Sequence, residues 1–125
     1  MGDGQHRSHL DLARKHLERV QAAWDEPTDW VDLTLYGFYC LENAIVAAAE
    51  ALGLPIKHTH PAKADAARRL HVEHGLPDVS ELLAKLNEAW KAVAYGDVDR
   101  PDLSAEDVAV ALEHYVDCVA GLVEP

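Results

Sequence analysis

Three residue types that could bind a ligand gather at the end of one predicted helix. Residues 82–97 carry apolar side chains at helical spacing and close with the tripeptide Tyr-Gly-Asp. Residues four apart lie on one face of a helix, so Lys91 and Tyr95 share its last turn. There Lys91 could bind an anion and Tyr95 could donate a hydrogen bond, with Trp90 and Asp97 beside them. The structural alternative places Trp90 in the core, uses Lys91 to complement the helix dipole, and makes Tyr95 a plug for the bundle end.

Polar side chains also interrupt a second predicted helix that is otherwise apolar nearly all round. Tyr39 and Glu42 lie three residues apart there, so they share a face. A buried carboxylate requires a partner. The cations that we expect to supply it are Lys91, Arg68 or Arg69. These residues predict either a polar pocket around Glu42 or a structural hydrogen-bond network inside the bundle.

Four histidines stand in two close pairs. His58 and His60 lie two apart in a predicted loop, and His71 and His74 lie three apart on a predicted helix. Imidazoles at such spacings can bind one metal ion. However, the chain has 8 histidines, which produce such pairs by chance, and no His-Glu-x-x-His pattern occurs. We predict no metal and no other cofactor, and we keep His58 and His60 as ligand-binding candidates.

The balance of charge limits the partners that the chain can bind. Its 125 residues form one predicted domain, 1–125, with 1–7 expected to be frayed. The formal net charge is −11, from 22 acidic and 11 basic residues. Such a chain repels the phosphate backbone, so we predict no non-specific DNA binding. Only the segment 57–69 is locally basic and could receive a phosphate.

The two cysteines indicate a reducing compartment. Cys40 and Cys118 both fall in the middle of predicted helices among apolar residues, which favours buried free thiols. No signal peptide and no apolar run long enough for a bilayer is present in this sequence. We therefore expect a cytoplasmic protein without a membrane partner.

The apolar periodicity predicts helices only. Apolar side chains recur at steps of three and four throughout, and no segment alternates with the period of a strand. We expect Gly96 to close the fourth helix in the left-handed conformation. The five predicted helices begin at Ser8, at Thr28 or Asp29, at Pro61, at Pro77 or Asp78, and at Ser104. At the fourth start, Asp78 and Glu81 are expected to form a capping box. The predicted fold is all-α, an up-and-down four-helix bundle with one short extra helix after the second.

Four stretches together resemble the HEPN superfamily, the small helical domains named for higher eukaryotes and prokaryotes nucleotide-binding. They are the aromatic-rich segment 35–44, the break Gly53-Leu54-Pro55, the tetrapeptide Lys57-His58-Thr59-His60, and the segment 86–97. The likeness covers about Trp30 to Val123 and is that of a divergent bacterial branch.

This resemblance implies a helical bundle that forms a homodimer and acts in toxin–antitoxin or defence systems. Active members of the family are metal-independent RNases that use an arginine and a histidine four to six residues apart. In an alignment on Asn87 and Gly96, those positions are Trp90 and Tyr95 in this chain. A phenol titrates at about pH 10 and cannot replace a histidine as an acid or base near neutrality. RNA cleavage by the family's route is therefore not expected.

The sequence is compatible with three functions. The leading hypothesis is a non-nucleolytic HEPN-like bundle, dimeric through its second helix, that binds a nucleotide, an RNA end or a protein partner near residues 90–97. The enzyme alternative is an RNase with a divergent signature that uses Lys91 and Tyr95, or His58 and His60. The third hypothesis is a structural or antitoxin-like subunit that binds the product of a neighbouring gene.

Overall fold

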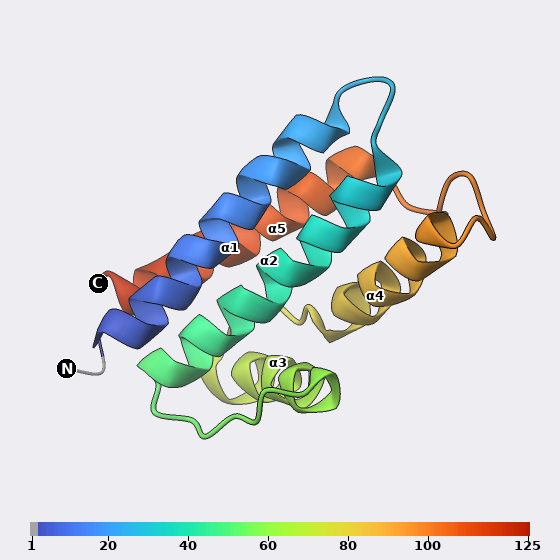
Figure 1. The fold of residues 1–125 in the computed structure, drawn as a ribbon. Helices are drawn as coiled ribbons and strands as arrows, with labels where there is room; N and C mark the ends of the chain where they lie inside the picture. Colours follow the sequence, from blue (N-terminus) through green and yellow to red (C-terminus); the bar gives the residue numbers. More distant parts are fainter. Residues whose placement is uncertain (1–2) are drawn as a thin grey trace.

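The described part of the chain is entirely helical. The computed structural model describes the backbone of residues 3–125 and the side chains from Ser8 onward. Over that range the chain forms helices and connecting loops and contains no strand (Figure 1). The helices are α1 (Asp3–Trp24), α2 (Trp30–Ala51), α3 (His60–His74), α4 (Ser80–Ala94) and α5 (Ala105–Val123). The prediction of an all-α bundle with an extra helix is confirmed.

Helix α2 is the centre of the bundle. It packs against each of the other four helices, while α1 also packs against α5, and α3 against α4. Figure 1 shows α1, α2 and α5 running side by side, with α4 along the other flank of α2 and α3 lying across one end. Because neighbours surround α2, 13 of its 22 residues are buried. The extra helix is α3, which at 15 residues is as long as α4.

One glycine lets two other helices reach the centre of α2. A Cβ atom added at Gly37 would lie 3.4 Å from both Leu86 Cδ1 of α4 and Leu112 Cδ1 of α5. Both leucines are fully buried. The missing side chain therefore allows α4 and α5 to place their core residues against the same point of α2.

Most helix ends follow the predicted local chemistry. Asp29, Thr59 and Ser104 cap α2, α3 and α5, because the side chain of each accepts a hydrogen bond from a backbone N–H of the first turn. Gly96 has φ 79°, and Asp97 N–H donates to Ala92 O at 2.8 Å. That bond, with Gly96 N–H donating to Val93 O, forms a Schellman motif. The predicted closure at Gly96 is confirmed.

Two predicted helix starts are wrong. Helix α1 begins at Asp3, so Ser8 lies inside it rather than at its cap. The sequence before Ser8 contains no proline, so no residue there is incompatible with the helical backbone. The prediction of fraying for 1–7 falls partly outside the described residues, since Met1 and Gly2 are not described and only the backbone is described for the rest.

The predicted capping box of Asp78 and Glu81 does not form. Helix α4 begins two residues later, and its N-cap residue Val79 makes no side-chain capping bond. The Asp78 carboxylate instead accepts hydrogen bonds from the N–H of Ser80 at 3.0 Å and from its hydroxyl at 2.7 Å. A turn in which the Asp78 side chain bonds to Ser80, two residues later, thus takes the place of a helix cap.

The two thiols differ in burial. Cys40 is fully buried, and the loss of solvation raises the pKa of its thiol to about 12. Cys118 is only half-buried, with its sulfur 3.9 Å from Nε2 of His114, so the expectation of two buried thiols holds for Cys40 alone. None of the helices in the described range is both long and apolar enough to cross a bilayer.

Candidate functional site

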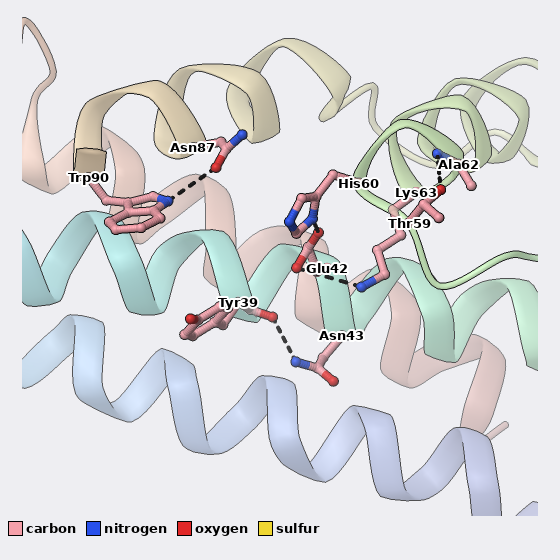
Figure 2. A network of polar contacts seen from close by, with 9 residues as sticks. All are labelled: Tyr39, Glu42, Asn43, Thr59, His60, Ala62, Lys63, Asn87 and Trp90. Carbon is pink, nitrogen blue, oxygen red and sulfur yellow. Dashed lines mark hydrogen bonds and ion pairs between the residues drawn. The ribbon is translucent and has the colours of Figure 1, made fainter. Parts of the chain in front are cut away.

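A buried carboxylate on α2 lies at the centre of the candidate site. The side chain of Glu42 is 6% exposed, and its Oε2 lies 2.5 Å from Nδ1 of His60. Its other oxygen, Oε1, lies 3.6 Å from Nζ of Lys63 (Figure 2). The expected need for a cationic partner is thus met by residues of α3. Neither Lys91 nor the two predicted arginines supplies it.

The first turn of α3 positions both partners of this carboxylate. The Thr59 hydroxyl accepts the N–H of Ala62 at 3.2 Å and so starts the helix, with Pro61 in its first turn. His60 and Lys63 lie three residues apart and therefore project from one face of that turn. The N-terminal end of a helix also carries partial positive charge, which further favours the Glu42 carboxylate.

The contact with Glu42 orients the imidazole of His60. A carboxylate only accepts hydrogen bonds, so Nδ1 carries the proton in this pair. The second ring nitrogen, Nε2, then points away from Glu42 and has no hydrogen-bond partner among the described residues (Figure 2). In neutral His60 that nitrogen is an acceptor held in a defined direction. The side chain is 62% exposed, so a ligand can reach it.

Asn87 of α4 is held in a similar way. Trp90 Nε1–H donates to Asn87 Oδ1 at 3.1 Å. Because an indole N–H can only donate, this bond identifies the amide oxygen and leaves the amide nitrogen free for another acceptor. Trp90 itself is half-buried against the core. The predicted residue Trp90 therefore acts by orienting its neighbour.

A small pocket lies between these two oriented side chains. It has a volume of about 210 Å³ and is lined by Phe38 of α2, by His60, Pro61 and Ala64 of α3, and by Leu83, Ala84 and Asn87 of α4. The ring of Phe38 lies 5.2 Å from that of His60, with a tilt of 59° between their planes. The pocket is thus mainly apolar and carries one imidazole and one amide at its edge.

Tyr39 faces away from this pocket. Figure 2 shows its side chain on the side of α2 that faces α1. Its ring lies 5.6 Å from that of His16 on α1 and 6.4 Å from that of Tyr36. Burial and the neighbouring charge of Arg19 lower the pKa of His16 below its ordinary value. Arg19 also donates to the Tyr36 hydroxyl at 3.1 Å. The predicted shared face of Tyr39 and Glu42 does not make a shared site.

The predicted site at the end of α4 does not converge. Lys91 is exposed, and its Nζ lies 6.0 Å from the ring of Trp90. Tyr95 is 75% exposed, and Asp97 contributes its backbone N–H to the helix end. His58 is also apart from the pocket, since its ring lies 6.3 Å from that of His9 on α1. Among the predicted residues of the described chain, Glu42 and His60 are the pair joined by a hydrogen bond between side chains.

The basic segment 57–69 is largely neutralised within the chain. Arg68 pairs with Asp65 at 2.7 Å, and Arg69 pairs with Glu73 at 2.8 Å. The hydrogen bond from Arg69 lowers the pKa of the Glu73 carboxyl. With Lys63 beside Glu42, three of the four cations in this segment have carboxylate partners, and Lys57 is the fourth.

The histidines do not form a metal centre in the described part of the chain, where no three His, Cys, Asp or Glu side chains converge on one point. His71 has another role, because its Nδ1 lies 2.7 Å from the carbonyl oxygen of Leu76 just beyond the end of α3. It therefore helps to hold the turn that leads into α4.

Three site residues were not predicted from the sequence: Lys63, Asn87 and Phe38, the last of which lies in the aromatic-rich segment 35–44. Lys63 could have been found from its spacing of three to His60 after a threonine cap, which places both on the first turn of one helix. Asn87 was used only to align a motif, although its spacing of three to Trp90 permits the observed hydrogen bond.

The fold and the site define a small all-α domain with a carboxylate-held imidazole beside an apolar pocket. No protein-family model matches the chain, and no solved structure matches it. Part of the chain is similar to the cytochrome c biogenesis ATP-binding export protein CcmA of Alcanivorax borkumensis, with 41% identity over 80 residues. The match covers 62% of this chain and 35% of that protein, so the chain spans about a third of the relative's length.

The nucleotide-binding loop known as Walker A has the pattern Gly-x-x-x-x-Gly-Lys-Ser/Thr. This sequence contains no glycine followed by lysine, so it has no such loop. The ATP binding in the relative's name therefore has no matching phosphate-binding motif here.

Proposed function

We propose that this chain is a HEPN-like, non-nucleolytic bundle that binds a nucleoside or mononucleotide through its base. One observation carries the proposal: His60 and Asn87 are each oriented by one hydrogen bond, and both line a pocket together with Phe38. Single bases are commonly recognised by stacking on aromatic rings and by hydrogen bonds to their edges. An imidazole acceptor and an amide donor match the donors and acceptors that base edges carry.

The size of the pocket sets the part of the ligand that enters. Pockets for drug-sized ligands have volumes of about 300–1,000 Å³, whereas this one has about 210 Å³. That space suits one heterocycle, with the ribose and phosphate outside. The exposed Lys91, next to Trp90 in the chain, is the nearest candidate on α4 for the phosphate.

Charge favours a single nucleotide over a nucleic-acid strand. Strand binding depends on several cations that replace counterions along the backbone. This chain has a net charge of −11, and Arg68 and Arg69 are both paired with acids. A mononucleotide needs one cation or none, so the acidic surface does not exclude it.

The binding proposal is tested by isothermal titration with the four nucleoside monophosphates and the four nucleosides. We expect His60→Ala and Asn87→Ala each to weaken binding by about tenfold, the effect of one lost hydrogen bond of about 1.4 kcal/mol. His74→Ala is the matched control, because it removes an exposed imidazole at the far end of the same helix. Equal binding of ribose 5-phosphate, or unchanged binding by both pocket variants, would refute base recognition.

A catalytic function is the second candidate, supported by the Glu42–His60 pair. A carboxylate that orients an imidazole is the arrangement used by general bases in hydrolysis. An RNase with a divergent signature would then use His60 rather than Lys91 and Tyr95. Incubation with labelled RNA in EDTA decides between the two, since cleavage that His60→Ala abolishes would favour the enzyme.

We also propose a homodimer, in line with the resemblance. Helix α2 is largely buried within one chain, so its accessible surface is the side next to α1. Leu12 and Tyr39 are 40% and 38% exposed there, and His16 lies between them. A Tyr39→Lys substitution should convert a dimer to a monomer in light scattering; a monomeric parent protein would contradict the proposal.

A further inference from the structure

A long groove runs along the side of α4 away from the base pocket. The first turns of α5 border one half of it, and the loop 98–103 that leads into α5 borders the other half. Two adjoining hollows of about 410 and 490 Å³ form it. Both are lined by Lys85, Asp102 and Leu103, so the groove is continuous past these residues. It extends from Asp78, two residues before α4, along the helix to Ala92, a length of about 20 Å. We refer to it as the α4–α5 groove.

The groove is open because the two helices that border it are held apart. Among the described residues, α4 and α5 make no direct backbone contact, although each packs against α2. Below the groove, Leu86 of α4 and Leu112 of α5 both reach Gly37 of α2. The walls above that point are apolar to a large extent. They include Leu82, Ala89, Ala92, Val98, Pro101, Leu103, Val108 and Ala111.

The rim of the groove is strongly acidic. Its lining contains five carboxylates, from Asp78, Glu81, Glu88, Asp102 and Asp107, against the two cations Lys85 and Arg100. Both cations are already engaged within the chain. Lys85 Nζ lies 3.3 Å from Glu81 Oε1, and the Arg100 guanidinium lies 5.4 Å from the centre of the Trp30 ring. The hydrogen bonds from Ser80 lower the pKa of the Asp78 carboxyl, which keeps that group charged.

We propose that the α4–α5 groove binds an amphipathic helix with basic flanks from a partner protein. An apolar channel between two helices accepts a third helix through side chains at positions i, i+3, i+4 and i+7. Lysine or arginine on either side of that stripe would then face the carboxylates of the rim. A second copy of this chain fits poorly, because its own surface carries the same negative charge.

The length of the groove sets the size of the partner segment. A helix that covers about 20 Å needs about 14 residues, or four turns. The proposed occupant is therefore one amphipathic helix of ordinary length with three or four large apolar side chains. This proposal concerns a different face from the base pocket and does not depend on nucleotide binding.

Titration with a synthetic helix tests the proposal. The probe is a 16-residue amidated peptide with leucine at the stripe positions and lysine on both flanks. A second peptide keeps the leucines and replaces every lysine by glutamate. We expect the basic peptide to bind and the acidic peptide not to bind. Failure of the basic peptide to bind, or equal binding of both peptides, would overturn the proposal.

A pair of charge-reversal variants locates the site. The rim variant combines Glu88→Lys with Asp107→Lys, two residues of the groove. The control variant combines Glu113→Lys with Asp117→Lys, which makes the same change in net charge at exposed positions of α5 outside the groove. The rim variant should weaken binding of the basic peptide by at least about tenfold, and the control variant by much less. Equal loss in both would show attraction to the net charge alone. A dimer that buries the groove, seen as hydrogen-exchange protection of α4 and α5 on raising the protein concentration, would also overturn the proposal.

Discussion

Replacing Glu42 and Lys63 together by apolar residues separates the structural role of this pair from its role in the site. The two side chains are 6% and 15% exposed, so both charges are largely removed from water. Breaking a buried pair leaves one uncompensated charge and costs about 3–5 kcal/mol, whereas replacing both members by apolar residues is often neutral or stabilising. The substitutions are Glu42→Leu, Lys63→Met, and the two combined.

The structure sets the expected magnitudes below the upper end of that range. Nζ of Lys63 lies 3.6 Å from the carboxylate, beyond a good hydrogen bond, and His60, the other partner, is 62% exposed. We therefore expect each single substitution to lower the free energy of unfolding by about 1–3 kcal/mol. The double variant should come within about 1 kcal/mol of the parent, so the two single losses should not add, as is usual for residues in contact.

Urea unfolding followed by circular dichroism measures these free energies, with an unchanged m-value as the check on the folded state. The double variant should also bind nucleosides more weakly, because His60 loses the carboxylate that orients it. A loss of stability in the double variant equal to the sum of the single losses would refute the reasoning. Glu42 and Lys63 would then stabilise the bundle independently of each other rather than as a pair.

Three further predictions test other groups in the bundle. Cys118 should react with a thiol reagent in the native protein, while Cys40, with its thiol pKa at about 12, should react only on unfolding. Cys118→Ser should abolish the native reaction, and fast labelling of that variant would contradict the prediction. The pKa of His16 is lowered in the folded protein. As the pH falls through the ordinary histidine pKa of about 6.5, His16 therefore binds a proton in the unfolded chain before it does so in the folded one, and the folded state loses stability. His16→Gln should therefore lose less stability than the parent between pH 7 and pH 5, and an identical slope would count against the shift. The Tyr115 hydroxyl is buried without a hydrogen-bond partner among the described residues. Tyr115→Phe should therefore raise the free energy of unfolding by up to about 1 kcal/mol, whereas a clear decrease in that free energy would imply a partner for the hydroxyl.

The features that could be predicted from sequence are those that depend on a few neighbouring residues. The caps at Asp29 and Ser104 and the glycine closure at Gly96 are local, and all three are confirmed. The start of α4 failed because Asp78 had two local uses, a helix cap or a turn with Ser80, and spacing does not distinguish them. The apolar surroundings of Glu42 on α2 correctly indicated a buried carboxylate.

The partner of that carboxylate could not be predicted, because it depends on how α3 lies across the end of the bundle. Arg68, Arg69 and Lys63 are all on α3, but among them only Lys63 lies in the first turn, next to Glu42 of α2. The two arginines lie beyond it and pair with acids of their own helix. The pocket could not be predicted for the same reason, because Phe38, His60 and Asn87 come from three helices whose relative angles are set by packing.

Helix α4 separates the base pocket from the α4–α5 groove, so the two proposals can fail independently. Successive residues of a helix differ by about 100° around its axis, which turns Asn87 toward the pocket and Glu88 toward the groove. Glu88→Lys should therefore leave nucleoside binding unchanged, and Asn87→Ala should leave binding of the basic peptide unchanged. If either substitution altered both activities, α4 itself would have moved. Leu86, which joins α4 to α2 over Gly37, would then be the residue through which one face affects the other.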